Sequence, residues 1–208
     1  PFEAIPHLDD PAYVGNGNQR VVDDPGFYLG TSRNFASPYR GQRVYQLLER
    51  HVGADEPVTM ADLQAMQRDT YSLAAEGFTP IVLNATDDMS SEAAALVREA
   101  DLADWNYEMV PDSKAALVYS RWLEHYRNAT FGDEYRAHGL DEGYYPHVWV
   151  LQHLPADSEW FDVAHTSRRE TRDDVAAQAM AVTARELEAE GWETYGDYHH
   201  TDLDHPFP

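Results

Sequence analysis

The sequence predicts an α+β protein that is mostly helical, with short strands near both ends of the chain. Helix start signals recur through its middle, where apolar residues follow helical spacing. Strand material is expected at 13–22, and the polar tail at 195–208 either pairs as a strand or frays. The chain shows no internal repeat, and its 208 residues are enough for one domain with a hydrophobic core, so 1–208 is treated as a single segment.

The first predicted strand, 13–22, is interrupted at its centre by the polar run Gly15-Asn16-Gly17-Asn18-Gln19. Glycines in a strand let another backbone or a ligand approach closely, and an asparagine amide is a typical donor to an oxyanion. Asn-Gly is also a strong turn signal, so a turn is the alternative. An irregular loop is expected at 23–38.

Two helices are predicted next. Ser37 caps the first, Pro38 takes its first position, and the helix fades by Gly53. Thr59 and Asp62 form a capping box at the start of the second. Both carry apolar residues at helical spacing: Val44, Leu47 and Leu48 in the first, and Leu63, Met66 and Leu73 in the second. The second helix is expected to break at Gly77 and Pro80.

The second half of the chain contains further helices. Their predicted caps are Ser90 or Ser91, Asp112 or Ser113, and Thr171. Gly191 ends the last of them. Residues 129–147 are rich in glycine and are expected to form loops, whereas 148–151 fit either a short strand or a helical turn.

The composition is strongly acidic. There are 37 acidic and 15 basic residues, the formal net charge is −22, and Lys114 is the one lysine. This charge argues against binding nucleic acid or an anionic membrane. Acidity with arginine in place of lysine resembles the surfaces of proteins from salt-loving organisms; the alternative is an ordinary acidic protein. The absence of cysteine excludes disulfides, thiolate catalysis and cysteine-bound zinc.

Several motifs follow one another in a specific order. They are YVGNGNQRVV from Tyr13, PYRGQRV from Pro38 and QRDTYS from Gln67, and then Trp160-Phe161-Asp162, Thr166, Glu170-Thr171-Arg172-Asp173-Asp174, Tyr195-Gly196-Asp197 and His205-Pro206. Together they resemble the penicillin acylase (penicillin amidase) family over nearly the whole chain. The resemblance implies an interior segment of the β chain of an N-terminal-nucleophile hydrolase, part of a four-layer αββα sandwich. It implies hydrolysis of a linear, small-molecule amide, such as an acylated β-lactam or an acyl-homoserine lactone, and favours an extracellular or cell-surface location.

The resemblance also assigns two catalytic-site residues. Asn18 matches the asparagine that completes the oxyanion hole of the family, and Arg40 matches an active-site arginine that positions it. Gly17 departs from the family, which commonly has alanine or a bulkier residue there, so we expect Asn18 to be held less rigidly. Without the resemblance, Arg40 would be a solvated arginine at a helix start, paired with Asp69.

The resemblance further implies that the nucleophile lies elsewhere. In the family, a chain-terminal serine attacks and its own α-amino group is the base, whereas this chain starts with Pro1. We therefore expect a partner segment or chain with that serine, and no turnover by this chain alone. Some members of the family bind calcium, but the matching position here is Leu29, and Asp23 and Asp24 are too weak a signal, so no cofactor is expected in this segment.

Two alternatives remain open from the sequence. The chain fits a non-catalytic helical remnant used for binding or assembly. It also fits a metal-dependent hydrolase built on polar residues of the tail: His199, His200, Asp202, Asp204 and His205. The spacing of this cluster matches no known site geometry, so a polar tail with incidental histidines is favoured.

Overall fold

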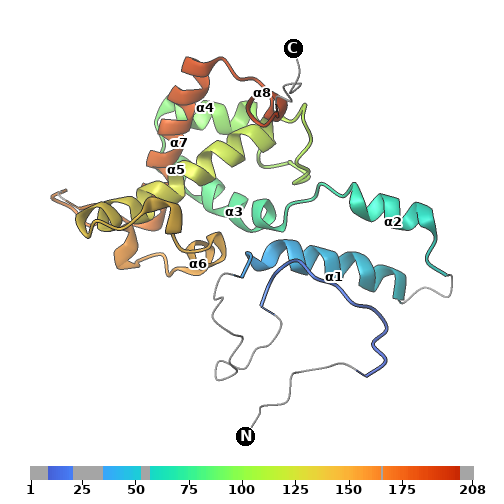
Figure 1. Ribbon diagram of the computed structural model, residues 1–208. Helices are drawn as coiled ribbons and strands as arrows, with labels where there is room; N and C mark the ends of the chain where they lie inside the picture. Colours follow the sequence, from blue (N-terminus) through green and yellow to red (C-terminus); the bar gives the residue numbers. More distant parts are fainter. Residues whose placement is uncertain (1–8, 21–34, 53–56, 165, 202–208) are drawn as a thin grey trace, which may run out of the picture. The chain divides into compact units, whose positions relative to one another are not determined.

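The described part of the chain is mostly helical, as predicted. The computed structural model describes residues 9–20, 35–52, 57–164 and 166–201, and its helices follow one another from α1 to α8 (Figure 1). These residues contain no strand, although Tyr71 and Glu108 form an isolated antiparallel bridge. The chain divides into two compact units, Pro1–Asp69 and Thr70–Pro208.

The first unit is organised around α1 (Pro38–Val52). The apolar side of this helix lies against Gly15: a Cβ atom added there would lie 3.1 Å from Val44 Cγ1 and 3.2 Å from Leu48 Cδ1. The Tyr45 hydroxyl donates a hydrogen bond to the Gly15 carbonyl oxygen, 3.0 Å away. The predicted apolar stripe of α1 therefore packs on the segment that precedes it in the chain.

The start of α1 differs from the prediction in one detail. The helix begins at Pro38, as expected, but the buried Ser37 hydroxyl makes no hydrogen bond to the described residues. Ser37 therefore does not cap the helix. The fixed φ of Pro38 still pre-organises the first turn, because proline matches the helical value and lacks an N–H that would need a partner.

Residues 13–20 form an irregular turn in place of the predicted strand. Asn18 has a φ of +60°, in the left-handed region that asparagine tolerates better than most residues. The Asn16 side-chain oxygen accepts the Asn18 backbone N–H at 2.6 Å, a local bond that competes with strand pairing. The turn alternative thus describes this stretch, and positions 21 and 22 lie outside the described residues.

The second helix, α2 (Met60–Gln67), is shorter than predicted. Its capping box is confirmed: the Thr59 hydroxyl accepts the Asp62 N–H, and the Asp62 carboxylate accepts the Thr59 N–H. The helix ends before Asp69, whose carboxylate accepts hydrogen bonds from Arg43 Nε and Nη2 at 2.8 and 2.6 Å. The prediction of one longer helix is wrong here: α2 ends at Gln67, and the backbone of the next residues bonds to 107–109, where the Ser72 N–H donates to the Tyr107 carbonyl oxygen at 2.9 Å.

The second unit begins with α3 (Leu73–Asn84), capped by Ser72. This helix runs through Gly77 and Pro80, which were expected to break it. Proline costs about 3 kcal/mol inside a helix, partly because the carbonyl of Glu76 loses its donor. Both Glu76 and Pro80 are exposed, so that carbonyl faces water. Burying one large apolar side chain stabilises by about 1.5–3 kcal/mol, and α3 buries several: Phe78, Ile81 and Val82.

Three longer helices begin at predicted caps: α4 (Ser91–Glu99) after Ser90, α5 (Lys114–Ala137) after Ser113, and α7 (Arg172–Glu190) after Thr171. In each case the side-chain oxygen of the cap accepts the backbone N–H three residues later. As predicted, α7 ends at Gly191, which has a φ of +70° and so occupies the conformation that favours glycine. These caps set the starts of α4, α5 and α7 and the end of α7.

The helix α5 extends further than predicted. Residues 129–147 were expected to form loops, but the helix continues to Ala137 and includes Gly132. Thr130 and Phe131 are completely buried, or nearly so, in the core of the unit. Packing of this face therefore overrides the weak helix propensity of glycine.

Short helical elements complete the unit: η1 (Thr86–Asp88), η2 (Glu142–Tyr144), α6 (Val148–His153), η3 (Glu159–Phe161) and α8 (Tyr195–Tyr198). Residues 148–151, which the sequence predicts as either a short strand or a helical turn, thus lie in helix α6. The start of the tail forms α8 and no strand is present up to residue 201.

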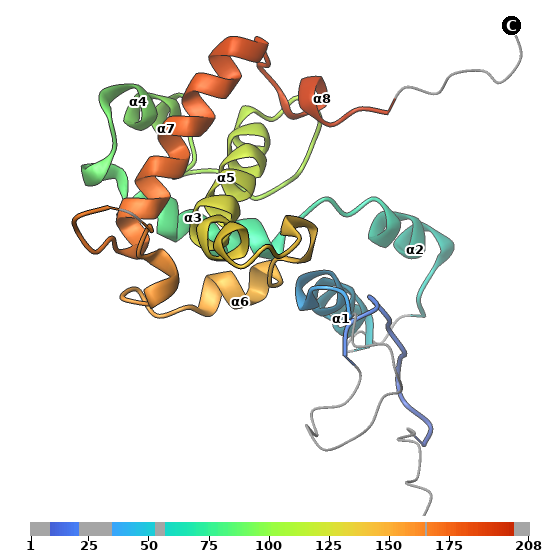
Figure 2. The ribbon, with the colours of Figure 1, turned by 60° about the vertical axis from the view of Figure 1, so that its left-hand side comes forward.

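The core of the second unit lies between α5 and α7, which pack along one another (Figure 2). Trp122 and Tyr126 stack with ring centroids 4.8 Å apart, and Phe161 stacks on Tyr126 at 6.2 Å. Phe78 of α3 meets both α5 rings edge-on. Trp122 Nε1 donates to the Ala176 carbonyl of α7 at 3.0 Å, so the largest core residue is fixed by both packing and a hydrogen bond.

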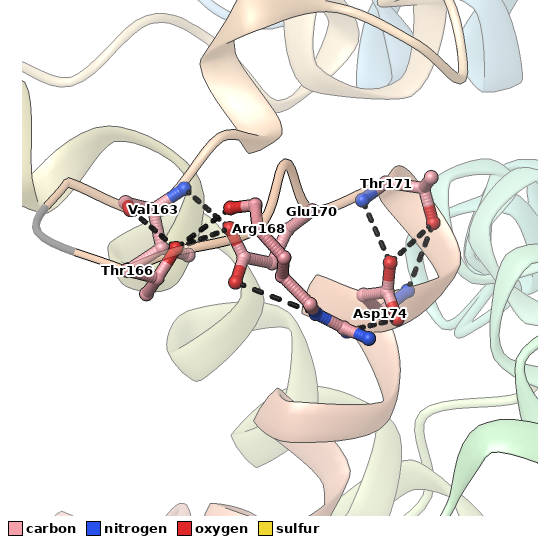
Figure 3. A network of polar contacts seen from close by, with 6 residues as sticks. All are labelled: Val163, Thr166, Arg168, Glu170, Thr171 and Asp174. Atoms are coloured by element: carbon pink, nitrogen blue, oxygen red, sulfur yellow. Dashed lines mark hydrogen bonds and ion pairs between the residues drawn. The ribbon is translucent and has the colours of Figure 1, made fainter.

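A polar network fixes the chain where it enters α7 (Figure 3). Buried Glu170 accepts a hydrogen bond from the Thr166 hydroxyl at 3.1 Å. Arg168 lies between two carboxylates, those of Glu170 and Asp174. Asp174 also completes a capping box with Thr171. Motifs that the sequence marked as family landmarks therefore serve here to hold the start of a core helix.

Candidate active site

Asn18 and Arg40, the two predicted site residues, lie in direct contact. Arg40 Nη2 donates a hydrogen bond to Asn18 Oδ1 at 2.5 Å and a second one to the Gly17 carbonyl oxygen at 2.9 Å. Both side chains are exposed. The Arg40 guanidinium, in the first helical turn of α1, thus holds the irregular turn formed by residues 13–20.

This contact fixes which way the Asn18 carboxamide faces. A guanidinium donates and never accepts hydrogen bonds, so the amide oxygen must point toward Arg40 and the NH₂ group away from it. A charged donor on the oxygen also polarises the amide, which strengthens its N–H groups as donors. Asn18 therefore presents an oriented, neutral NH₂ group, which is the feature that an oxyanion donor needs.

The Asn18 backbone is held from two sides. Its N–H donates to Asn16 Oδ1, and its carbonyl oxygen accepts the Ala36 N–H at 2.8 Å. Gly17 is held as well, since its N–H donates to Gln19 Oε1 at 2.6 Å. Gly17 was expected to leave Asn18 loosely held, whereas the hydrogen bonds around it tie the turn to α1 and to its own side chains.

Sequence reasoning missed the supporting residues of this segment: Asn16, Gln19 and Gly41. The signal for Asn16 and Gln19 was present in the alternation of amide side chains and glycines at 15–19, which is unusual for a strand. The alternative partner expected for Arg40 is wrong, because Asp69 pairs with Arg43, one turn further along α1. Arg43 and Asp69 are only 14% and 18% exposed, and they hold α1 to the chain that follows α2.

The candidate metal ligands are not brought into a site in the part of the chain that can be described. Asp23, Asp24 and Leu29 lie outside the described residues, as do three of the five tail residues. His199 stacks on Tyr195, and His200 Nδ1 lies 3.1 Å from the Asp197 carbonyl oxygen. The described residues contain no group of three or more His, Asp or Glu side chains that could hold a metal ion.

One carboxylate pair in the second unit has an unusual proton affinity. Burial and the neighbouring Asp133 raise the pKa of Glu134 to about 7. Its Oε2 atom is buried and makes no hydrogen bond within the described structure. Burial opposes ionisation of Asp133 too, but hydrogen bonds from Glu134 and from the Ala164 N–H outweigh burial and lower its pKa. The pair therefore shares a proton near neutral pH.

Comparison with known proteins gives one match. The family model described as penicillin amidase matches residues 1–208. No curated protein and no solved structure matches the chain. Among the described helices, none combines the length and apolar character needed to cross a membrane.

Proposed function

Since the chain belongs to the penicillin amidase family, we propose that it is the part of an acylase-like amidohydrolase that supplies the oxyanion donor, Asn18, and its positioning residue, Arg40. Family membership supports the reaction class, hydrolysis of an amide. The observation that supports the two roles is the hydrogen bond from Arg40 Nη2 to Asn18 Oδ1, which turns the Asn18 NH₂ group outward.

The chemistry gives each residue a task. When a nucleophile attacks an amide carbonyl, the carbonyl oxygen gains negative charge, and a pre-oriented N–H stabilises that charge more than it stabilises the neutral substrate. Asn18 Nδ2 donates to this oxygen. Arg40 holds the amide from behind, because its Nη2 donates to both Asn18 Oδ1 and the Gly17 carbonyl oxygen. In this proposal Arg40 therefore acts through Asn18.

The nucleophile in this proposal is a chain-terminal serine on a partner segment or chain. Its hydroxyl oxygen attacks the carbonyl carbon, and its own α-amino group takes the proton and passes it to the leaving amine as the C–N bond breaks. Water then hydrolyses the acyl ester. The proposed substrate is a linear, non-peptide amide, such as an acylated β-lactam or an acyl-homoserine lactone.

The test is release of the chromophore from an acyl anilide, in multimolar salt, by the chain assembled with the segment that carries the terminal serine. Asn18→Ala is expected to lower kcat by about 10²–10³-fold, the usual effect of removing one oxyanion donor. Gln42→Ala, which removes an exposed amide from α1, is the matched control and should leave kcat unchanged. An Asn18→Ala enzyme with the kcat of the parent would exclude the proposed role.

A further inference from the structure

The backbones of Gly17 and Gly41 approach each other more closely than side chains would allow. A Cβ atom added to Gly17 would lie 2.6 Å from both the Cα and the N atom of Gly41. Both glycines are buried, and Gly41 is the buried residue of α1. Neither has a positive φ. Close approach to the backbone of α1 therefore requires glycine at position 17, whereas a Cβ atom at position 41 would meet the Gln19 side chain.

The side chain of Gln19 fills the remaining space beside this contact. Its Oε1 accepts the Gly17 N–H at 2.6 Å. A Cβ atom added to Gly41 would lie 2.7 Å from Gln19 Cδ and Oε1. The Gln19 amide therefore lies on the bare backbone of α1 and holds the residue that precedes Asn18.

We propose that Gly17, Gln19 and Gly41 are positioning residues that set where the Asn18 carboxamide lies relative to Arg40. This inference rests on the proposed function. Asn18 follows Gly17 in the chain, and Arg40 precedes Gly41, so the glycine contact and the Arg40–Asn18 hydrogen bond join the same two segments side by side. Any group that separates the glycines also separates the guanidinium from the amide.

Glycine at position 17 has a physical reason in this geometry. A methyl group at position 17 would meet backbone atoms of α1, which cannot rotate away as a side chain does. A displacement of about 1 Å at a catalytic group typically costs on the order of 10²-fold in rate. Gly17 thus permits a short link between the turn and α1, and its N–H donates to Gln19 Oε1, which holds the residue before Asn18.

The experiment measures kcat and KM of the assembled acylase on the acyl anilide. Gly17→Ala is expected to lower kcat by about 10–10²-fold with little change in KM, since it misplaces a transition-state donor. Gly15→Ala is the matched control, because the atoms nearest to its new methyl group are side-chain carbons of Val44, Leu48 and Tyr45, at 3.1, 3.2 and 3.7 Å. Gln19→Leu is a second variant that removes the acceptor without adding bulk to the backbone, and it should lower kcat in the same way.

The Asn18→Ala background separates positioning from a general structural effect. If the three residues act through Asn18, Gly17→Ala and Gln19→Leu will cause no further loss of kcat in that background. If Gly17→Ala and Gln19→Leu lower kcat equally in the parent and in the Asn18→Ala background, the inference is overturned. It is also overturned if both variants keep the kcat of the parent while Asn18→Ala lowers it. Unchanged kcat in Asn18→Ala would overturn the proposed function and, with it, this inference.

Discussion

Arg121 of α5 and Glu186 of α7 form a two-point ion pair between helices 65 residues apart in sequence. Arg121 Nε and Nη2 donate to the two Glu186 carboxylate oxygens at 2.8 and 2.6 Å. The Arg121 guanidinium also lies 4.7 Å from the ring centroid of Tyr198, in α8. This arginine therefore links three helices of the second unit.

We predict that Glu186→Ala lowers the free energy of unfolding by about 2–3 kcal/mol, because it leaves the guanidinium, whose side chain is only 9% exposed, without its main partner. Urea denaturation measures this. Glu99→Ala is the matched control: it breaks the exposed pair with Lys114 and should cost about 0.5 kcal/mol or less. Equal effects of the two substitutions would show that the Arg121 pair contributes no more than a surface ion pair.

A second prediction concerns pH. The pKa of Glu134 is raised to about 7, so between its ordinary value near 4.5 and about 7 the folded protein retains a proton that the unfolded chain has released. The protonated Glu134 therefore contributes stability that is fully present below the ordinary pKa of 4.5 and is lost as pH rises through the folded-state pKa of about 7. The lowered pKa of Asp133 acts in a lower pH range, below its ordinary 3.8.

The measurement is the free energy of unfolding from pH 5 to 8 for the parent and for Glu134→Gln, which cannot ionise. The parent should lose stability relative to the variant as pH rises. Glu142→Gln, at an exposed carboxylate on η2, is the control and should keep the slope of the parent. Parallel curves for the parent and Glu134→Gln would contradict the shared proton.

A third prediction concerns salt, and follows from the proposal of a halophilic protein. With a net charge of −22, repulsion among acidic side chains destabilises the compact state. Raising salt from 0.1 to 1 M shortens the screening length from about 10 to about 3 Å. The melting temperature should therefore rise with NaCl concentration, and more than it does with sucrose at equal osmolality. A melting temperature independent of NaCl would argue for an ordinary acidic protein.

The helix starts could be predicted from the sequence because capping is local. Thr59, Ser90, Ser113 and Thr171 each interact with a backbone N–H only three residues away, so a short window of sequence contains both partners. The same applies to Gly191, whose role depends on its own φ. The helix starts at these four caps were located to within a residue.

Features decided by distant partners could not be predicted in this way. Asp69, just beyond the end of α2, pairs with Arg43, which lies 26 residues earlier in the chain. Continuation of α3 through Pro80 depends on which of its faces is buried. In the candidate site, the residue types were predicted, but the contact of Gly17 with Gly41 was not, because a sequence does not show which backbones approach closely.

The central claim is that Arg40 acts through Asn18, and a double-mutant cycle on acyl anilide hydrolysis by the assembled acylase tests it most directly. Arg40→Ala alone should lower kcat, since it frees the Asn18 carboxamide to rotate. The account predicts that the Asn18→Ala, Arg40→Ala double variant has the same kcat as Asn18→Ala alone. Losses that multiply in the double variant would show that Arg40 acts independently of Asn18 and would contradict the account.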